Sequence, residues 1–232
     1  MSQSIHTGHR QRLKARFLKE GLDNFTDIQV LELALFYCIP QKDTNPIAHA
    51  LLDHFGSLSQ VLEASPEELQ KVKGIGENTA TFLNLITQIG RYYLVDRVQR
   101  VEVLTTIEQC GAYLVPRFFG RKLETVFLLC LDAKCKVLCC KEVGEGSVNS
   151  AGISVRRIVE TALGANATSV VLAHNHPSGM ALPSAEDIQT TRRVAAALSA
   201  VEVTLVDHIV VADDDYVSMV QSGYRFDEFL LP

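Results

Sequence analysis

The chain has 232 residues, which is long enough for one large domain or two modest domains with their own hydrophobic cores. Hydrophobic residues make up 47% and charged residues 21%, a composition that excludes disordered and fibrous proteins. No apolar run is long enough to cross a bilayer, the first residues lack the apolar segment of a signal peptide, and the six cysteines follow no disulfide-like spacing. We therefore expect a cytoplasmic protein with reduced thiols and no membrane partner.

Charge is distributed unevenly along the chain. Residues 1–100 hold 11 lysine and arginine residues against 11 aspartate and glutamate residues, so residues 101–232 carry the whole net charge of −5. Only the first twenty residues are clearly basic, which suits contacts with phosphates but equally suits a solvated helix face. Charge alone therefore does not require a nucleic-acid partner.

Residues 1–98 carry apolar side chains at helical spacing with little extended alternation, which predicts a small all-α domain. Ser65 and Pro66 suit the N-cap and the first helical position of a short helix. The helices expected in this half are residues 27–37, 46–55, 66–72 and 78–94.

A glycine-rich turn separates the last two of these helices. In the segment Val72-Lys73-Gly74-Ile75-Gly76, the glycines allow a sharp turn while Ile75 fills the gap, and backbone N–H groups face outward beside a helix N-terminus, where anions are favoured. The segment resembles the hairpin of helix-hairpin-helix domains, which implies DNA phosphate contacts at Lys73, Gly74 and Gly76. A structural αα-hairpin or a protein-docking module would show the same pattern, and this half lacks a basic footprint.

After residue 100 the pattern changes to strands that alternate with helices. This predicts an α/β domain in residues 101–232, a mixed sheet flanked by helices with a polar site at the sheet edge. The whole chain is therefore expected to be α+β, with a helix-hairpin-helix-like N-terminal domain in front. The expected strands are residues 125–131, 136–143, 170–173, 203–211 and 216–220, and the expected helices are residues 155–163 and 185–198.

The string His174-Asn175-His176-Pro177, followed by Ser184 and Asp187, is the most informative feature of the chain. It follows an apolar, β-branched run typical of a buried strand, and side chains two apart on a strand point to the same face. His174 and His176 can therefore aim two imidazoles at one point, where Asp187 would add a carboxylate. Two histidines and one carboxylate, with the fourth position left to water, are the pattern of a catalytic zinc site.

Local spacing leaves a second interpretation of these residues open. Ser184 and Asp187 also match a capping box at the start of a helix, so Asp187 could serve the helix, the metal or both. A second zinc cluster, formed by Cys135, Cys139 and Cys140, is disfavoured because adjacent residues of a strand face opposite sides.

Residues from about 100 to 232 resemble the RadC branch of the JAMM (MPN-type) metalloprotease-like domains, whose fold is cytidine-deaminase-like. The helical N-terminal half likewise resembles the segment that precedes this domain in RadC proteins. The resemblance rests on His174-Asn175-His176-Pro177-Ser178-Gly179, on Pro183-Ser184 and Asp187, and on residues 146–150 and 205–211.

The resemblance implies a zinc-dependent hydrolase that cleaves peptide or isopeptide-type amide bonds in a protein or peptide substrate. The zinc (Zn2+) ligands carried over are His174, His176 and Asp187. In the family, zinc lowers the pKa of its bound water and so supplies hydroxide at neutral pH.

Further site residues follow from the same resemblance. The general base is a glutamate that opens an apolar strand, for which Glu124 is the best match and Glu142 the alternative. Ser184 matches the serine whose hydroxyl stabilises the oxyanion. His208 fits the RadC pattern and either supports a ligand from behind or is a structural histidine.

The competing hypothesis is a DNA-associated, repair-linked binding protein with a silent or nuclease-type C-terminal domain. All five catalytic-type residues are present, which argues against a silent domain. Nucleases named for the letters His-Asn-His have these residues dispersed, and the Pro-Cys-x-x-Cys of zinc deaminases is missing. Asn175 and residues 154–158 depart from the patterns of eukaryotic and other RadC relatives respectively, so a substrate cannot be transferred from the eukaryotic enzymes.

Overall fold

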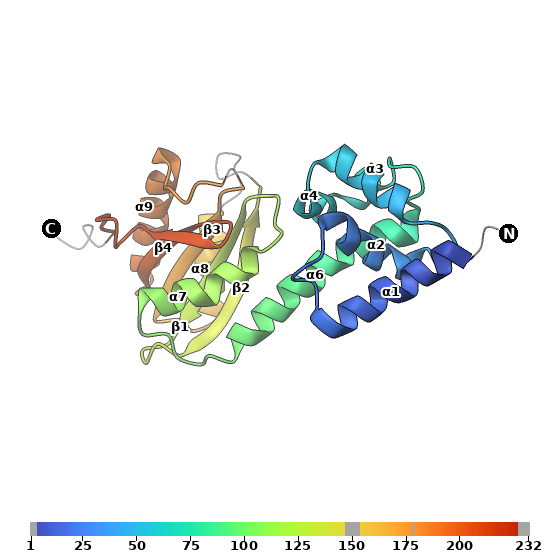
Figure 1. Ribbon diagram of the computed structural model, residues 1–232. Coiled ribbons are helices and arrows are strands. Elements are labelled where there is room, and N and C mark those ends of the chain that lie inside the picture. Colours follow the sequence, from blue (N-terminus) through green and yellow to red (C-terminus); the bar gives the residue numbers. More distant parts are fainter. Residues whose placement is uncertain (1–3, 147–153, 178, 227–232) are drawn as a thin grey trace. The chain divides into compact units, whose positions relative to one another are not determined.

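A computed structural model of the chain describes residues 4–146, 154–177 and 179–226 (Figure 1). Residues 147–150 and Ser178, which contribute to the family resemblance, lie outside the described residues. The chain forms two compact units, residues 1–89 and residues 90–232. The division falls within helix α6 (Glu77–Gln99), whereas the sequence pattern placed it after residue 98.

The first unit is helical, as the periodicity predicts. Helix α2 begins with a capping box, because Thr26 accepts the N–H of Gln29 and the Gln29 side chain accepts the N–H of Thr26. The hydrophobic core of this unit includes leucine and isoleucine side chains of α2, α3 and α6. The helices before α6 are α1 (Ser4–Glu20), α2 (Asp27–Cys38), α3 (Asn45–Phe55), α4 (Leu58–Glu63) and α5 (Pro66–Leu69).

The turn between α5 and α6 shows why the sequence needs a glycine there. Gly74 has φ +100°, and a Cβ at this position would lie 3.0 Å from the side chain of Ile47. Ile75 is buried in the core, and Lys73 is exposed. Gly76 has open space around it, so of the two glycines in this turn Gly74 is the one that packing requires.

The second unit contains a five-stranded sheet with the order β2-β1-β3-β4-β5. Strands β3 and β4 are parallel and joined by helix α9, and the other neighbours are antiparallel. The mixed sheet with flanking helices confirms the predicted fold class. The strands are β1 (Thr125–Leu131), β2 (Val137–Glu145), β3 (Ser169–Asn175), β4 (Thr204–Ala212) and β5 (Asp215–Ser218), and the helices are α7 (Ile107–Leu114), the 3-10 helix η1 (Val115–Phe118), α8 (Val155–Gly164) and α9 (Ala185–Ser199).

Helices cover both faces of this sheet, so its central strands are largely apolar and buried (Figure 1). Val126 and Leu172 pack with α8 and α9 on one face, whereas Phe127 and Val171 pack with α7 on the other. The β3–β4 register shifts at Val206, which has no partner on β3 and forms a bulge. We call the first face the α9 face and the second the α7 face.

The order of the strands places the polar site at the strand ends in the middle of the sheet. β3 is the middle strand, and its C-terminal end lies between β1 and β4 rather than on an edge strand. Edge position could not be inferred from the sequence because strand order depends on long-range pairing. Among the described residues, no helix combines the length and apolar character that a membrane span requires.

Candidate metal centre

Three side chains converge at the C-terminal end of β3. His174 is the second-last residue of the strand, His176 follows it, and Asp187 lies in the first turn of α9. The two Nε2 atoms are 2.9 Å apart. Asp187 Oδ1 lies 3.3 Å from His174 Nε2, and Asp187 Oδ2 lies 3.4 Å from His176 Nε2. One ligand atom of each residue falls within 4.8 Å of the others, so the group could hold a metal ion.

Asp187 serves the helix and the cluster at once. Its backbone N–H donates to Ser184 Oγ at 3.1 Å, and its Oδ2 accepts the Ser184 N–H at 2.7 Å, which completes a capping box. This box fixes the rotamer of the carboxylate and turns the other oxygen, Oδ1, toward His174. The two interpretations left open by the sequence are therefore compatible in one geometry.

The hydrogen-bond inventory of the cluster fits a cation. His176 Nδ1 lies 3.0 Å from the Met180 carbonyl oxygen, which can only accept, so Nδ1 carries the proton and Nε2 presents a lone pair. Asp187 Oδ1 is buried and accepts no hydrogen bond from the described residues. Buried acceptors without donors are costly, and a metal ion would satisfy both.

Two pKa shifts reflect this arrangement. Burial alone would raise the pKa of Asp187, but the contacts with His174 and Ser184 outweigh it and hold the pKa far below its ordinary value. Burial, followed by the neighbouring His174, lowers the pKa of His208 well below its ordinary value, with Asp187 acting in the opposite direction. Asp187 is thus ionised and His208 neutral near pH 7.

The strand register separates the two candidate glutamates. Val126 of β1 pairs with His174, so continuing the register by one side-chain repeat sets Glu124 opposite His176, on the same face. Glu142 instead pairs with Phe127 on the α7 face, and its Oε2 lies 2.9 Å from Arg121 Nη2. Glu124 therefore lies at the histidine-bearing end of the sheet, and Glu142 does not share its face.

Two polar residues at this centre, Asn175 and Thr191, were assigned no role from the sequence. Asn175 Oδ1 accepts the Thr125 N–H at 2.7 Å and its Nδ2 donates to the Leu123 carbonyl at 3.3 Å, which fastens the segment carrying Glu124 to β3. Thr191, one helical turn after Asp187, is fully buried against His208. Its position one helical turn after the predicted ligand Asp187 could have indicated a supporting role, but its contact with His208 on β4 could not be predicted from the sequence.

The remaining predicted residues are not ligands of the cluster, although His208 contacts it directly. His208 is on β4, and its Nε2 lies 2.8 Å from His174 Nδ1. Lys73, Gly74 and Gly76 belong to the first unit, whereas the metal cluster belongs to the second. Cys139 packs on the α9 face and Cys140 on the α7 face, so they do not form a joint metal site with Cys135.

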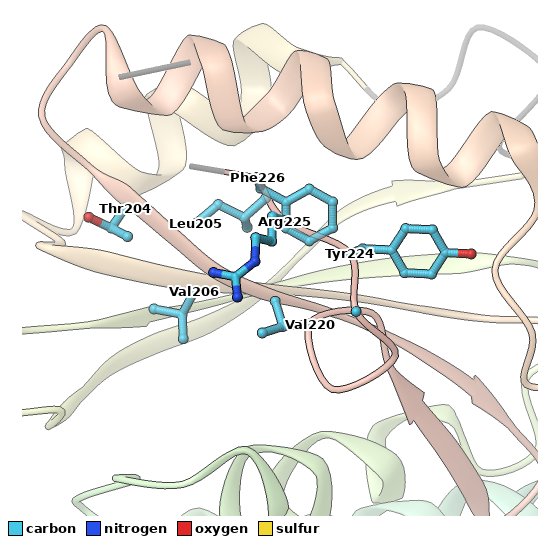
Figure 2. Close-up of a pocket in the computed structure, with 8 residues that line it drawn as sticks. Thr204, Leu205, Val206, Val220, Tyr224, Arg225 and Phe226 are labelled. Atoms are coloured by element: carbon cyan, nitrogen blue, oxygen red, sulfur yellow. The ribbon is translucent and has the colours of Figure 1, made fainter. Parts of the chain in front are cut away.

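A pocket of about 420 Å³ lies at the opposite end of β4 from the cluster. Its lining side chains come from the start of β4 and from the segment after β5 (Figure 2). They are mostly apolar, with Arg225 as the cation among them. No predicted site residue lines this pocket, which consists of residues 204–206, 220 and 223–226.

The fold and the cluster define a JAB-type domain: residues 104–224 match the family described as RadC-like JAB domain, and residues 6–81 match the family described as UPF0758 N-terminal. A UPF0758 protein of Fusobacterium nucleatum subsp. nucleatum is 32% identical over 230 residues, which cover 96% of this chain and 99% of the relative. UPF0758 proteins of Paraburkholderia phytofirmans and Ruegeria pomeroyi are 36% and 34% identical, covering 91% and 93% of this chain and 82% and 96% of those relatives. The chain belongs to the RadC family, as its motifs predict.

Proposed function

We propose that the protein is a zinc-dependent hydrolase that cleaves peptide or isopeptide-type amide bonds, with zinc held by His174, His176 and Asp187. The observation that carries the proposal is the convergence of a histidine lone pair with a buried carboxylate oxygen that has no donor among the described residues. Two nitrogens and one carboxylate leave a coordination position open, as in catalytic zinc sites. When bound, zinc would polarise the scissile carbonyl and lower the pKa of water.

Glu124 is the proposed general base. It would take a proton from the attacking water and pass it to the leaving amine, a role typically worth about 10²–10⁴-fold in rate. The strand register supports this assignment, because the continued pairing of β1 with β3 sets Glu124 on the same face as His174 and His176. Asn175 supports it as well, since its side chain fastens the start of β1 to the end of β3.

Ser184 is the proposed oxyanion donor. Its Oγ accepts the N–H of Asp187, and this bond does not use the hydroxyl hydrogen, which is the proposed donor to the oxyanion. A single donor of this kind is typically worth about 2.7–4 kcal/mol of barrier. The cap and the catalytic role therefore use different parts of one hydroxyl group.

The first test is the metal content of the purified protein. We expect about one zinc per wild-type chain by elemental analysis and none in the His174→Ala/His176→Ala variant. Wild-type protein that takes up no zinc when zinc is supplied would contradict the proposal.

The second test compares two glutamates of the same chain. Glu124→Gln in zinc-loaded protein should lower the hydrolysis of peptide and isopeptide substrates by about 100-fold or more while the zinc content is unchanged. Glu142→Gln is the matched control, because it removes a carboxylate that faces Arg121, and its rate should equal that of the wild type. Equal rates for all three proteins would exclude Glu124 as the base, and full activity without zinc would exclude the metal mechanism.

DNA association through the first unit is a second candidate. It is supported by the turn at Gly74, where a positive φ presents the exposed Lys73 beside the N-terminus of α6. Fluorescence anisotropy with a short DNA duplex should then show affinity that falls with salt, and Lys73→Ala should reduce the salt slope by about one. Absent or salt-independent binding would exclude this candidate without bearing on the hydrolase.

A further inference from the structure

A chain of buried polar groups lies behind His174. His174 Nδ1 is 2.8 Å from His208 Nε2, and His208 Nδ1 is 2.5 Å from Thr191 Oγ1. The same Thr191 oxygen lies 2.5 Å from the backbone carbonyl oxygen of Asp187. The side chains of these four residues are almost completely inaccessible to solvent, so water does not complete their hydrogen bonds from outside.

The direction of every hydrogen bond in this chain follows from its last member. A carbonyl oxygen can only accept, so the Thr191 hydroxyl hydrogen points to Asp187. Thr191 Oγ1 must then accept from His208, which places the His208 proton on Nδ1. The His208 ring is buried, and its two nitrogens contact only Thr191 and His174 in the described part of the chain, so no carboxylate hydrogen-bonds the ring to stabilise a second proton. Its Nε2 therefore accepts from His174 Nδ1. The proton of His174 therefore sits on Nδ1, and its Nε2 presents a lone pair to the cluster.

We infer, on the basis of the proposed metal centre, that Thr191 is a positioning residue which selects the metal-binding tautomer of His174 through His208. It also joins two ligands, because the chain begins on the ring of His174 and ends on the backbone of Asp187. The three lone pairs of the cluster are thus directed at one point before a metal arrives. Partners of this kind typically change metal affinity by about 10–100-fold.

A simpler role for Thr191 must be distinguished from this one. Threonines within helices often bond the carbonyl four residues earlier, with no further function. Helix α8 provides a matched example, since Thr161 Oγ1 donates to the Arg157 carbonyl at 2.7 Å. Among the described residues Thr161 bonds no histidine, so it shares the backbone contact of Thr191 but not the contact with an imidazole.

Zinc affinity of the full-length protein, measured by competition with a chromophoric chelator, tests the inference. Thr191→Val should weaken zinc binding by about 10–100-fold, while Thr191→Ser should restore it to within about threefold of the wild type. Thr161→Val should bind zinc like the wild type. Wild-type affinity in Thr191→Val would overturn the role of Thr191, whereas a wild type without zinc affinity would overturn the metal centre instead.

A second measurement needs neither a variant nor a metal. Nitrogen-15 NMR of the histidine rings in zinc-free wild-type protein reports which nitrogen carries each proton. We expect a proton on Nδ1 of both His174 and His208, with the His208 ring neutral near pH 7. A His174 proton on Nε2 would overturn the inference even if Thr191→Val fails to fold.

Discussion

Strand β4 carries two adjacent polar residues that are equally buried and differently used. Asp207 points to the α7 face, where its Oδ1 accepts the N–H groups of His208 and Val220 at 2.7 and 3.0 Å and its Oδ2 accepts Ser218 Oγ at 2.5 Å. His208 points to the α9 face and belongs to the chain that ends in the metal cluster. The donors of the Asp207 cluster satisfy its carboxylate, whereas Asp187 Oδ1 of the metal cluster accepts no hydrogen bond within the described part of the chain. Hydrogen-bond demand, more than burial or charge, therefore separates a structural polar cluster from a ligand-binding one.

Among the tests of this difference between the two clusters, we expect the largest effect on zinc affinity. Asp187→Ala removes one of three ligands, and zinc sites typically bind with about 10–16 kcal/mol, so affinity should fall by at least about a thousandfold. Asp207→Ala should leave zinc affinity nearly unchanged, because its carboxylate faces away from the cluster. Chelator competition on both variants checks this, and a comparable loss in Asp207→Ala would make the two clusters one functional unit.

Stability should show the reverse order. Asp207→Ala strands two backbone N–H groups and one hydroxyl in the interior, so the free energy of unfolding should fall by about 3 kcal/mol or more. Asp187→Ala loses part of a capping box, and its cost should be about 1 kcal/mol in zinc-free protein. Urea denaturation of the zinc-free variants measures both, and equal losses would show that the Asp207 cluster is not the structural one.

The two carboxylates should also respond to pH in opposite senses. The pKa of Asp187 is lowered in the folded state, so its stabilisation is complete above the unfolded value of 3.8 and is lost as pH falls toward the folded pKa. Burial raises the pKa of Asp207 despite the hydrogen bonds from Ser218, Val220 and His208, so its stabilisation is complete below 3.8 and is lost as pH rises through the folded pKa.

Unfolding free energies of zinc-free wild type, Asp187→Asn and Asp207→Asn between about pH 3 and 7 test these signs. The advantage of the wild type over Asp187→Asn should grow as pH rises from 3. Its advantage over Asp207→Asn should shrink over the same range. Differences that change in the same direction would refute the opposed shifts.

The smallest effect compares the two helix caps beside the sheet. Ser184 caps α9 and Ser154 caps α8, each by accepting a backbone N–H, so replacing either by alanine should cost about 1 kcal/mol of stability. Only Ser184→Ala should also lower kcat for amide hydrolysis, because Ser154 has no proposed role in the reaction. Steady-state kinetics beside urea denaturation separates the two contributions, and equal kcat values would leave Ser184 as a cap alone.

Periodicity sufficed for the parts of the molecule that depend on neighbours in sequence. The strand before His174, the shared face of His174 and His176, and the cap formed by Ser184 and Asp187 all follow from local spacing. Helices α1, α4 and α7 were not among the expected helices. For α4 and α7 the reason is their length, because six and eight residues are too few to establish a helical period. The RadC signature supplied Glu124, which composition and spacing could not.

The contacts behind the cluster could not be predicted, because they depend on how distant strands are aligned. His208 reaches His174 only because it pairs with Leu172 on the neighbouring parallel strand. Thr191 reaches His208 only because α9 packs on β4. Asn175 was noticed as a departure from other relatives, yet its bonds to Thr125 and Leu123 follow from the pairing of β1 with β3.

The bulge at Val206 determines which face of the sheet each later residue of β4 points to. Leu205 before the bulge and Val210 after it both pack on the α9 face, although their separation is odd, because Val206 shifts the alternation by one residue. In an unbroken strand the alternation would send Asp207 to the α9 face and His208 to the α7 face. The imidazole behind His174 would then be a carboxylate, and the neutral relay would be replaced by a charge. One residue without a functional group of its own thus keeps a histidine facing the metal cluster.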